Sequence, residues 1–267
     1  MSQNPSPSKR ERKEAARAER LERERADAAA ASRRKRMTLL GGLLVGAIAI
    51  VVVAVAISSG GSKKSSGGDA SSIQGAADAK AMLAGIPQSG TTLGKPDAPV
   101  TILEFADPQC PYCKEYTLNE MPKVIQDDVR TGKAKMQLNY LTFIGPDSVK
   151  AASVLEAAGL QNKLWTASDV FYRNQGEENS GYVTDDFLTA VLDAAGADSA
   201  KAIAAAGDPK VTAALGEAKT GASRYGVDST PTILVGPTGG QMTQVQGTPT
   251  AAAISKLVDQ AAAKAGT

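Results

Sequence analysis

The sequence contains no histidine and only two cysteines among its 267 residues. Without histidine, the chain cannot build a Ser-His-Asp triad, a histidine metal site or a histidine pH switch. Two thiols are too few for a four-thiolate zinc site within one chain. These absences exclude the commonest hydrolytic and zinc-dependent chemistries, and they direct attention to the two cysteines themselves.

Charge is unevenly distributed, although the formal net charge is only +2. Residues 1–36 contain 12 Lys or Arg and 6 Asp or Glu, whereas the rest of the chain carries 18 basic and 22 acidic residues. Binding to nucleic-acid phosphates requires a surplus of Lys and Arg. The mildly acidic main part of the chain therefore argues against a nucleic-acid partner.

An uncharged apolar run of 21 residues extends from Met37 to Ile57. At about 1.5 Å per helical residue, it can cross the roughly 30 Å hydrocarbon core of a bilayer. The basic cluster Arg33–Arg36 precedes this run, and the positive-inside rule keeps such a cluster in the cytoplasm. The sequence thus predicts a charged cytoplasmic tail over 1–36 and a single-pass transmembrane signal anchor over 37–57. The protein would lie in the cell membrane, with its C-terminal domain outside the cytoplasm.

A cleaved signal peptide is the competing interpretation of the apolar run, because Ala54-Val55-Ala56 resembles a cleavage site. The run is longer than the usual apolar region of about 7–15 residues, and a long tail precedes it. We therefore favour an uncleaved anchor.

A Gly/Ser/Ala-rich stretch follows the anchor, and the sequence predicts a flexible linker over 58–90. From about Thr91 the composition becomes globular. Hydrophobic periodicity and turn residues predict elements in this order: a strand over 100–105, a helix over 113–129, a strand over 135–142, a helical region over 148–225, a hairpin with strands at 232–235 and 241–245, and a final helix over 250–264.

The two cysteines lie three residues apart, in Cys110-Pro111-Tyr112-Cys113, between the first predicted strand and the first predicted helix. Unpaired N–H groups and the helix dipole stabilise a thiolate on Cys110, and Pro111 suits the first helical turn. Cys113, one turn further on, would point inward and resolve a mixed disulfide. This spacing predicts a redox-active Cys110–Cys113 dithiol. A structural disulfide and half of a zinc site shared across a dimer are the alternatives.

Three stretches resemble the DsbA-like thioredoxin-fold oxidoreductases. The run from Leu93 to Tyr116 resembles the family's active-site region, and the segment 225–232 resembles its cis-proline loop. The segment from Leu164 to Gln175 resembles the Trp-containing helix of the family's inserted helical domain. The matches occur in family order and cover nearly all of 91–267. They imply an α/β thioredoxin-like fold with a helical insertion at about 146–222, preceded here by one transmembrane helix.

The resemblance also assigns roles to individual residues. It implies that Cys110 is the nucleophile and Cys113 the resolving thiol, with Pro231 as a cis-proline facing them. Thr230 would contact the thiolate and pair with a client strand. Apart from the resemblance, Tyr112 is expected to tune Cys110 or to touch clients, and Pro111 is a further candidate for client contact. Glu104 matches the family's buried acid, which relays a proton to the resolving thiol; a partly exposed strand residue paired with a lysine is its alternative.

Two positions depart from the family pattern, and three aromatic residues belong to the predicted insertion. Ser229 replaces a common glycine, and Ser168 replaces a histidine found in many members. Trp165, Phe171 and Tyr172 are expected in the core of the insertion rather than in contact with clients.

The predicted function is thiol–disulfide exchange outside the cytoplasm, in the direction that oxidises exported cysteine-containing client proteins. A reductase or isomerase is the alternative within this class, and a redox-inert client-binding chaperone module is the alternative outside it. An oxidase must be recycled, which implies a membrane-embedded, quinone-linked partner. No bound cofactor and no metal are expected.

Overall fold

The computed structural model describes residues 73–265. The predicted tail over 1–36, the predicted anchor over 37–57 and residues 58–72 of the predicted linker lie outside the described residues. Among the helices that the structure does describe, none is long and apolar enough to cross a membrane.

Six strands in the described range form one mixed sheet in the order β1-β2-β4-β3-β5-β6. Central β3 pairs in parallel with β4 and antiparallel with β5. The predicted strands at 100–105, 135–142 and 232–235 correspond to β3, β4 and β5, and the predicted hairpin is formed by β5 and β6. The bounds are β1 Gln88–Ser89, β2 Thr92–Leu93, β3 Val100–Ala106, β4 Ala134–Tyr140, β5 Thr232–Pro237 and β6 Thr243–Gln244.

The side chains of β3 alternate between the two faces of the sheet and define two apolar layers. Val100 and Ile102 belong to the large core under α3, α4 and α10, whereas Phe105 packs in a smaller cluster with Ala218 and Ala222 of α9. The alternation places Glu104 on the same face as Ile102. The acid therefore lies on the side of the sheet that carries the α3 helix. The helices of these layers are α3 Pro111–Asn119, α4 Met121–Val124, α9 Pro209–Tyr225 and α10 Ala251–Ala265.

The helix predicted over 113–129 is interrupted. It begins at Pro111, ends at Asn119, and continues after Glu120 as α4 and the π-helical segment η2, Ile125–Val129. Pro122 explains the interruption, because its ring would clash with the carbonyl one turn earlier and it has no N–H to donate. At this turn the Glu120 carboxylate accepts a hydrogen bond from the backbone N–H of Ala251 at 2.7 Å.

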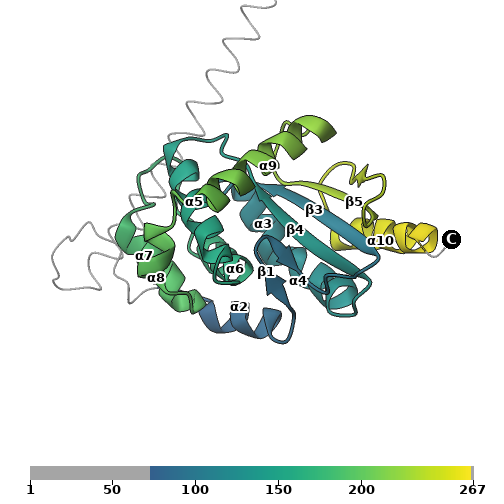
Figure 1. Cartoon of the computed structure of the whole chain (residues 1–267), viewed down its shortest axis with the longest axis horizontal. Coiled ribbons are helices and arrows are strands. Elements are labelled where there is room, and N and C mark those ends of the chain that lie inside the picture. The colour runs from purple at the N-terminus through teal and green to yellow at the C-terminus, as the bar shows by residue number, and fades with distance from the viewer. Residues whose placement is uncertain (1–72, 266–267) are drawn as a thin grey trace, which may run out of the picture. The chain divides into compact units, whose positions relative to one another are not determined.

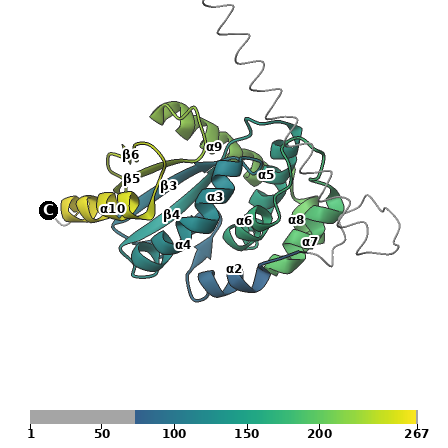
Figure 2. The same ribbon diagram turned by 180° about the vertical axis from the view of Figure 1, so that it is seen from behind.

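The helical region between β4 and β5 is divided as predicted at its glycine-containing breaks. The structure forms α5 Pro146–Gly159, α6 Leu164–Arg173, α7 Asp185–Ala195 and α8 Ser199–Ala204, followed by α9. Helices α5–α8 gather at one end of the sheet and α10 lies at the other, in both views (Figures 1 and 2). Helix α9 also packs on β4 and the sheet, so the predicted insertion at 146–222 includes a helix that belongs partly to the sheet layers.

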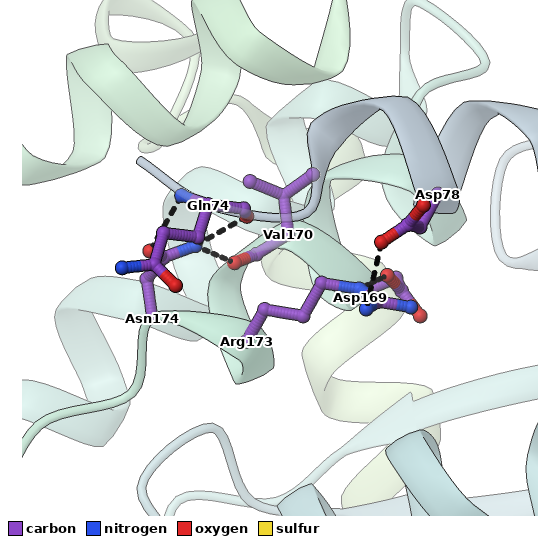
Figure 3. A network of polar contacts seen from close by, with 6 residues as sticks. All are labelled: Gln74, Asp78, Asp169, Val170, Arg173 and Asn174. Carbon is purple, nitrogen blue, oxygen red and sulfur yellow. Dashed lines mark hydrogen bonds and ion pairs between the residues drawn. The ribbon is translucent and has the colours of Figure 1, made fainter. Parts of the chain in front are cut away.

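The predicted linker over 58–90 extends too far. Residues 76–83 form α2 and residues 88–89 form β1, so the folded domain already includes residues before 91. The backbone of Gln74 donates to Asn174 Oδ1 at 2.9 Å, and Asn174 Nδ2 donates back to the Gln74 carbonyl at 3.0 Å (Figure 3). Composition alone suggested a linker here, but contacts with a helix about 100 residues later hold the segment in place.

Arg173 adds an ionic contact to this junction (Figure 3). Its guanidinium pairs with the fully buried Asp169 of the same helix and lies 3.7 Å from Asp78 of α2. Burial raises the pKa of Asp169, and Arg173 opposes that shift. A carboxylate in such a position depends on its cation, because an unpaired charge inside a protein is costly.

Replacing Arg173 with methionine is expected to lower the free energy of unfolding by about 2–4 kcal/mol at pH 7, because Asp169 would be left buried without its cation. The measurement is urea unfolding of the full-length chain, followed by fluorescence of Trp165, the only tryptophan. The matched control is Lys150→Met, which breaks the exposed Lys150–Asp185 pair and should cost at most about 0.5 kcal/mol. Equal losses in the two variants would contradict the assignment.

Candidate active site

The turn from β3 into α3 places the two cysteines at a helix N-terminus. Cys110 is the N-cap residue with extended backbone angles, and Pro111 is the first helical residue. Cys113 is completely buried, whereas Cys110 is 5% exposed. Both thiols are free, so the structure represents the dithiol form of the site.

The loop before β5 forms the second wall of the site. The Thr230–Pro231 peptide bond is cis, as the resemblance implies. When Cys110 is protonated, its thiol donates to the backbone carbonyl of Thr230, with the two atoms 3.3 Å apart. Residues 120 positions apart in the sequence are therefore brought together around the Cys110 sulfur.

The two thiols have opposite acidities. A hydrogen bond from the Cys113 thiol lowers the pKa of Cys110 to about 6 against the opposing effect of burial, and the Thr230 side chain and the N–H groups of Tyr112 and Cys113 add to the lowering. Burial, followed by the interaction with Cys110, raises the pKa of Cys113 well above its usual value. At neutral pH the site therefore contains a thiolate at Cys110 and a neutral thiol at Cys113.

Glu104 is buried, 1% exposed, on the sheet face that carries α3. Burial raises its pKa to about 8, and its Oε2 atom has no hydrogen-bond partner within residues 73–265. The alternative of an exposed residue paired with a lysine does not match this burial. A cavity of about 10 Å³, the size needed for one water molecule, adjoins Glu104, Thr117 and Ser168. A protonated carboxyl in this position can hold a proton close to the resolving thiol.

Asp107 is a structural residue of the site that the sequence did not single out. Its Oδ1 atom accepts from the backbone of Gln109 at 2.9 Å and from the Ser148 hydroxyl at 2.6 Å. Its Oδ2 atom accepts from the backbone N–H groups of Phe143 and Ile144. One buried carboxylate thus fixes the loop before Cys110 to the loop after β4. In the sequence, the only indication of this role was the position of Asp107 between a predicted strand and the Cys-x-x-Cys motif.

Two glutamines connect the same loop to the inserted helices. Gln175, just after α6, donates its side-chain amide to the carbonyls of Pro108 at 2.8 Å and Cys110 at 3.1 Å. The side-chain carbonyl of Gln109 accepts the backbone N–H of Asn179 at 2.7 Å. The Tyr172 hydroxyl adds a bond to the Asp107 carbonyl. The insertion therefore supports the backbone of the nucleophile directly.

The aromatic residues of the insertion lie in its core, as expected. Trp165, Phe171 and Tyr172 are each at most 1% exposed. Ser168, in the position of the family histidine, accepts from the Tyr140 hydroxyl at 2.7 Å and donates to the Leu164 carbonyl at 2.6 Å. Serine at this position thus fills a buried structural role.

A groove of about 430 Å³ begins beside the dithiol, between α3 and the loops before β5 and α10. Tyr112, Thr230 and Pro231 line the groove, and Tyr112 is 69% exposed. Pro111, the other residue predicted to contact clients, is exposed at the helix start but does not line the groove. No cluster of three or more Cys, Asp or Glu suited to a metal ion occurs in the described range.

A dithiol at the start of a helix, faced by a cis-proline loop on a mixed sheet, defines a thioredoxin-fold redox site. The family whose sequence model is described as thioredoxin matches residues 88–260, and the chain belongs to this family. "Probable disulfide bond formation protein D" of Bacillus cereus is 33% identical over 103 residues, which are 38% of this chain and 48% of the relative. The corresponding protein of Bacillus subtilis is 32% identical over 98 residues, or 36% of this chain and 44% of the relative. The chain thus spans about half the length of the curated relatives it matches.

Solved structures share the fold over a larger part of the chain. Oxidised BdbD from Bacillus subtilis matches with a TM-score of 0.58 and 20% identity, covering 67% of this chain and 97% of that chain. Wolbachia pipientis alpha-DsbA1 matches with a TM-score of 0.56 and 17% identity, covering 66% and 92%. These matches confirm a DsbA-like thioredoxin fold with inserted helices.

Glu104 should make the reduced protein less stable as the pH rises. Its pKa is about 8 in the folded state against 4.5 as its ordinary value, so the unfolded chain binds fewer protons between these values and stability falls with pH. Relative to Glu104→Gln, the wild-type protein should lose about 3 kcal/mol of unfolding free energy between pH 5 and pH 8. Urea unfolding of both reduced proteins at the two pH values measures this difference.

Glu156, whose pKa burial raises to about 7, is present in both proteins and cancels in the comparison. A difference in stability that does not change with pH would show that Glu104 is not a buried titrating acid.

Proposed function

We propose that the chain is a thiol:disulfide oxidase that introduces disulfides into exported cysteine-containing proteins. The observation that carries the proposal is the pair of thiols with opposite acidity, a thiolate at Cys110, which is 5% exposed, and a neutral thiol at the completely buried Cys113. The relatives named disulfide bond formation protein D support the same chemistry. A structural disulfide would have no use for such a difference between its two sulfurs.

The reaction begins with the Cys110–Cys113 disulfide and a reduced client. A client thiolate attacks the Cys110 sulfur, the Cys110–Cys113 bond breaks, and Cys113 leaves as a thiolate. Glu104, protonated near neutral pH, is positioned on the correct face to supply the proton that Cys113 takes up. A second client thiolate then attacks the client sulfur of the mixed disulfide and expels Cys110 as a thiolate. The client loses two electrons and the Cys110–Cys113 pair gains them.

The direction of exchange follows from the stability of the product thiolate. A lowered pKa makes Cys110 a good leaving group and stabilises the dithiol form, which makes the disulfide form a stronger oxidant. This favours an oxidase over a reductase or an isomerase. The groove beside Cys110, lined by Tyr112 and Thr230, would hold the client segment that carries the reacting cysteine.

The proposal also includes how the dithiol is reoxidised and where in the cell the chain lies. Each turnover leaves the dithiol reduced, so a membrane-embedded, quinone-linked partner would have to accept its electrons, and no cofactor bound to this chain is needed. The apolar run from Met37 to Ile57 would anchor the chain in the cell membrane and hold the catalytic domain outside the cytoplasm.

The reduction potential of the full-length chain in mild detergent tests the direction. Equilibration in glutathione buffers should give a potential nearer to about −120 mV than to about −270 mV, and the Cys110 thiolate absorbance should titrate near pH 6 in the same sample. The oxidised chain should convert a reduced dithiol peptide to its disulfide. Cys113→Ser, mixed with the disulfide form of the peptide, should accumulate the mixed disulfide, because the Cys110 thiolate attacks the peptide disulfide, expels one peptide thiolate and has no second thiol to resolve the product.

Cys110→Ser is the control that separates the candidate functions. Exchange should fall to the uncatalysed rate in this variant. Client binding that survives while no exchange is detected even in the wild-type chain would support the chaperone alternative, and a potential near about −270 mV would support a reductase.

The predicted topology has its own test. Protease added to intact spheroplasts should digest the catalytic domain and leave the tail over 1–36 protected, as followed with epitope tags at the two ends. Full protection of the domain would reverse the predicted orientation, and release of the intact domain into the medium would indicate a cleaved signal peptide.

A further inference from the structure

One face of α3 forms a wall of the groove beside the dithiol. Tyr112, Glu115, Tyr116 and Asn119 are spaced three, four and seven residues apart, so their side chains share one side of the helix. Thr230 and Pro231 belong to the opposite wall. Any segment held next to Cys110 by the cis-proline loop therefore runs along this face of α3.

The groove is acidic, and no cation in it neutralises its charge. Glu115 and Glu120 both line it, and none of the lining residues in the described range is Lys or Arg. Glu115 is exposed, and no ion pair within 73–265 includes it. The ammonium of the neighbouring Lys114 donates instead to the Gln175 carbonyl at 3.4 Å, outside the groove lining. The Glu115 carboxylate is thus available to a bound segment.

Tyr116 contributes a mostly buried side chain to the same wall of the groove. Its side chain lines the groove and is 3% exposed, yet its hydroxyl has no hydrogen-bond partner within the described residues. Buried hydroxyls are ordinarily paired. Burial is the main cause that raises the pKa of Tyr116, followed by the neighbouring Glu104 and Glu120.

The spacing along α3 sets which client position Glu115 can reach. Glu115 follows Cys110 by five residues, or roughly 7.5 Å along a helix. An extended segment advances about 3.3 Å per residue, so the residue two positions from the reacting client cysteine lies opposite Glu115.

We propose that Glu115 makes the groove selective for client segments with Lys or Arg two residues from the reacting cysteine. This selectivity rests on the proposed oxidase function and specifies its substrates. The same basic residue also assists the chemistry, because a nearby cation increases the thiolate fraction of the client cysteine. Glu115 acts as a specificity residue rather than a catalytic one, because it interacts with the client at a distance from the reacting sulfurs.

The test uses three reduced dithiol peptides that differ only at the positions two residues from each cysteine, which are Lys, Gln or Glu. The oxidised full-length chain in mild detergent is mixed with each peptide in buffer of about 20 mM ionic strength, and the second-order rate constants of peptide oxidation are compared. The Lys peptide should react about five to ten times faster than the Glu peptide, since opposite charges mainly raise the rate of association. In about 1 M salt, where the screening length is about 3 Å, the ratio should approach one.

Glu115→Lys should reverse the order of the Lys and Glu peptides, and Glu115→Gln should reduce their ratio to about two or less. Comparing the same peptides across variants cancels their intrinsic thiol reactivity. The matched control is Glu217→Lys on α9, an exposed residue that makes the same charge change outside the groove. This control should keep the wild-type order and the wild-type rate with the Gln peptide.

The outcomes separate this proposal from the proposed function. Equal rates for the three peptides, or a preference that survives Glu115→Lys, would overturn the selectivity and leave the oxidase function intact. A reversal in Glu217→Lys as well would assign the effect to the net charge of the domain and would also overturn the role of Glu115. Failure to oxidise any peptide would overturn the proposed function itself.

Discussion

The hydrogen bond between the two thiols is the interaction on which the site depends. It is the largest contribution to the low pKa of Cys110, and, after burial, the same contact raises the pKa of Cys113 and helps to keep its proton in place. The bond exists because one cysteine caps α3 while the other, one turn later, faces the interior. Local helix geometry therefore creates two unequal sulfurs from two identical residues, and without this difference neither sulfur would have a separate role.

That bond requires the loop before α3 to be held in one conformation, and several buried polar contacts serve this purpose. Asp107 fixes the loop to the segment after β4, and Gln175 fixes the carbonyls on either side of residue 109. Because Gln175 and Ser148, a further partner of Asp107, lie on the insertion, the inserted helices are part of the framework that supports the nucleophile. Supporting contacts of this kind decide whether a reactive group keeps a productive geometry.

The sequence predicted the features that local pattern encodes and missed those that distant contacts create. The β3 strand, the dithiol and the breaks between α5 and α9 follow from alternation, spacing and glycine, and the resemblance supplied the cis bond before Pro231. Helix α2 was missed because a Gly/Ala/Ser stretch resembles a linker until Asn174 and Arg173 fix it. Gln175 was missed because a polar residue after a helix is ordinarily solvated, and nothing in its own neighbourhood shows that it contacts Cys110.

The end of α6 and the two residues that follow it make two sets of contacts, one with the segment before α2 and one with the loop before Cys110. Arg173 contacts Asp78 of α2, and Asn174 contacts Gln74 just before that helix (Figure 3). Tyr172 and Gln175 donate hydrogen bonds to the loop before Cys110. Successive residues of a helix are rotated by about 100°, because a turn contains 3.6 residues. A single inserted or deleted residue in α6 would rotate all four side chains away from their partners together. The length of this helix is therefore under tighter constraint than its composition, and natural variation here should consist of substitutions rather than gaps.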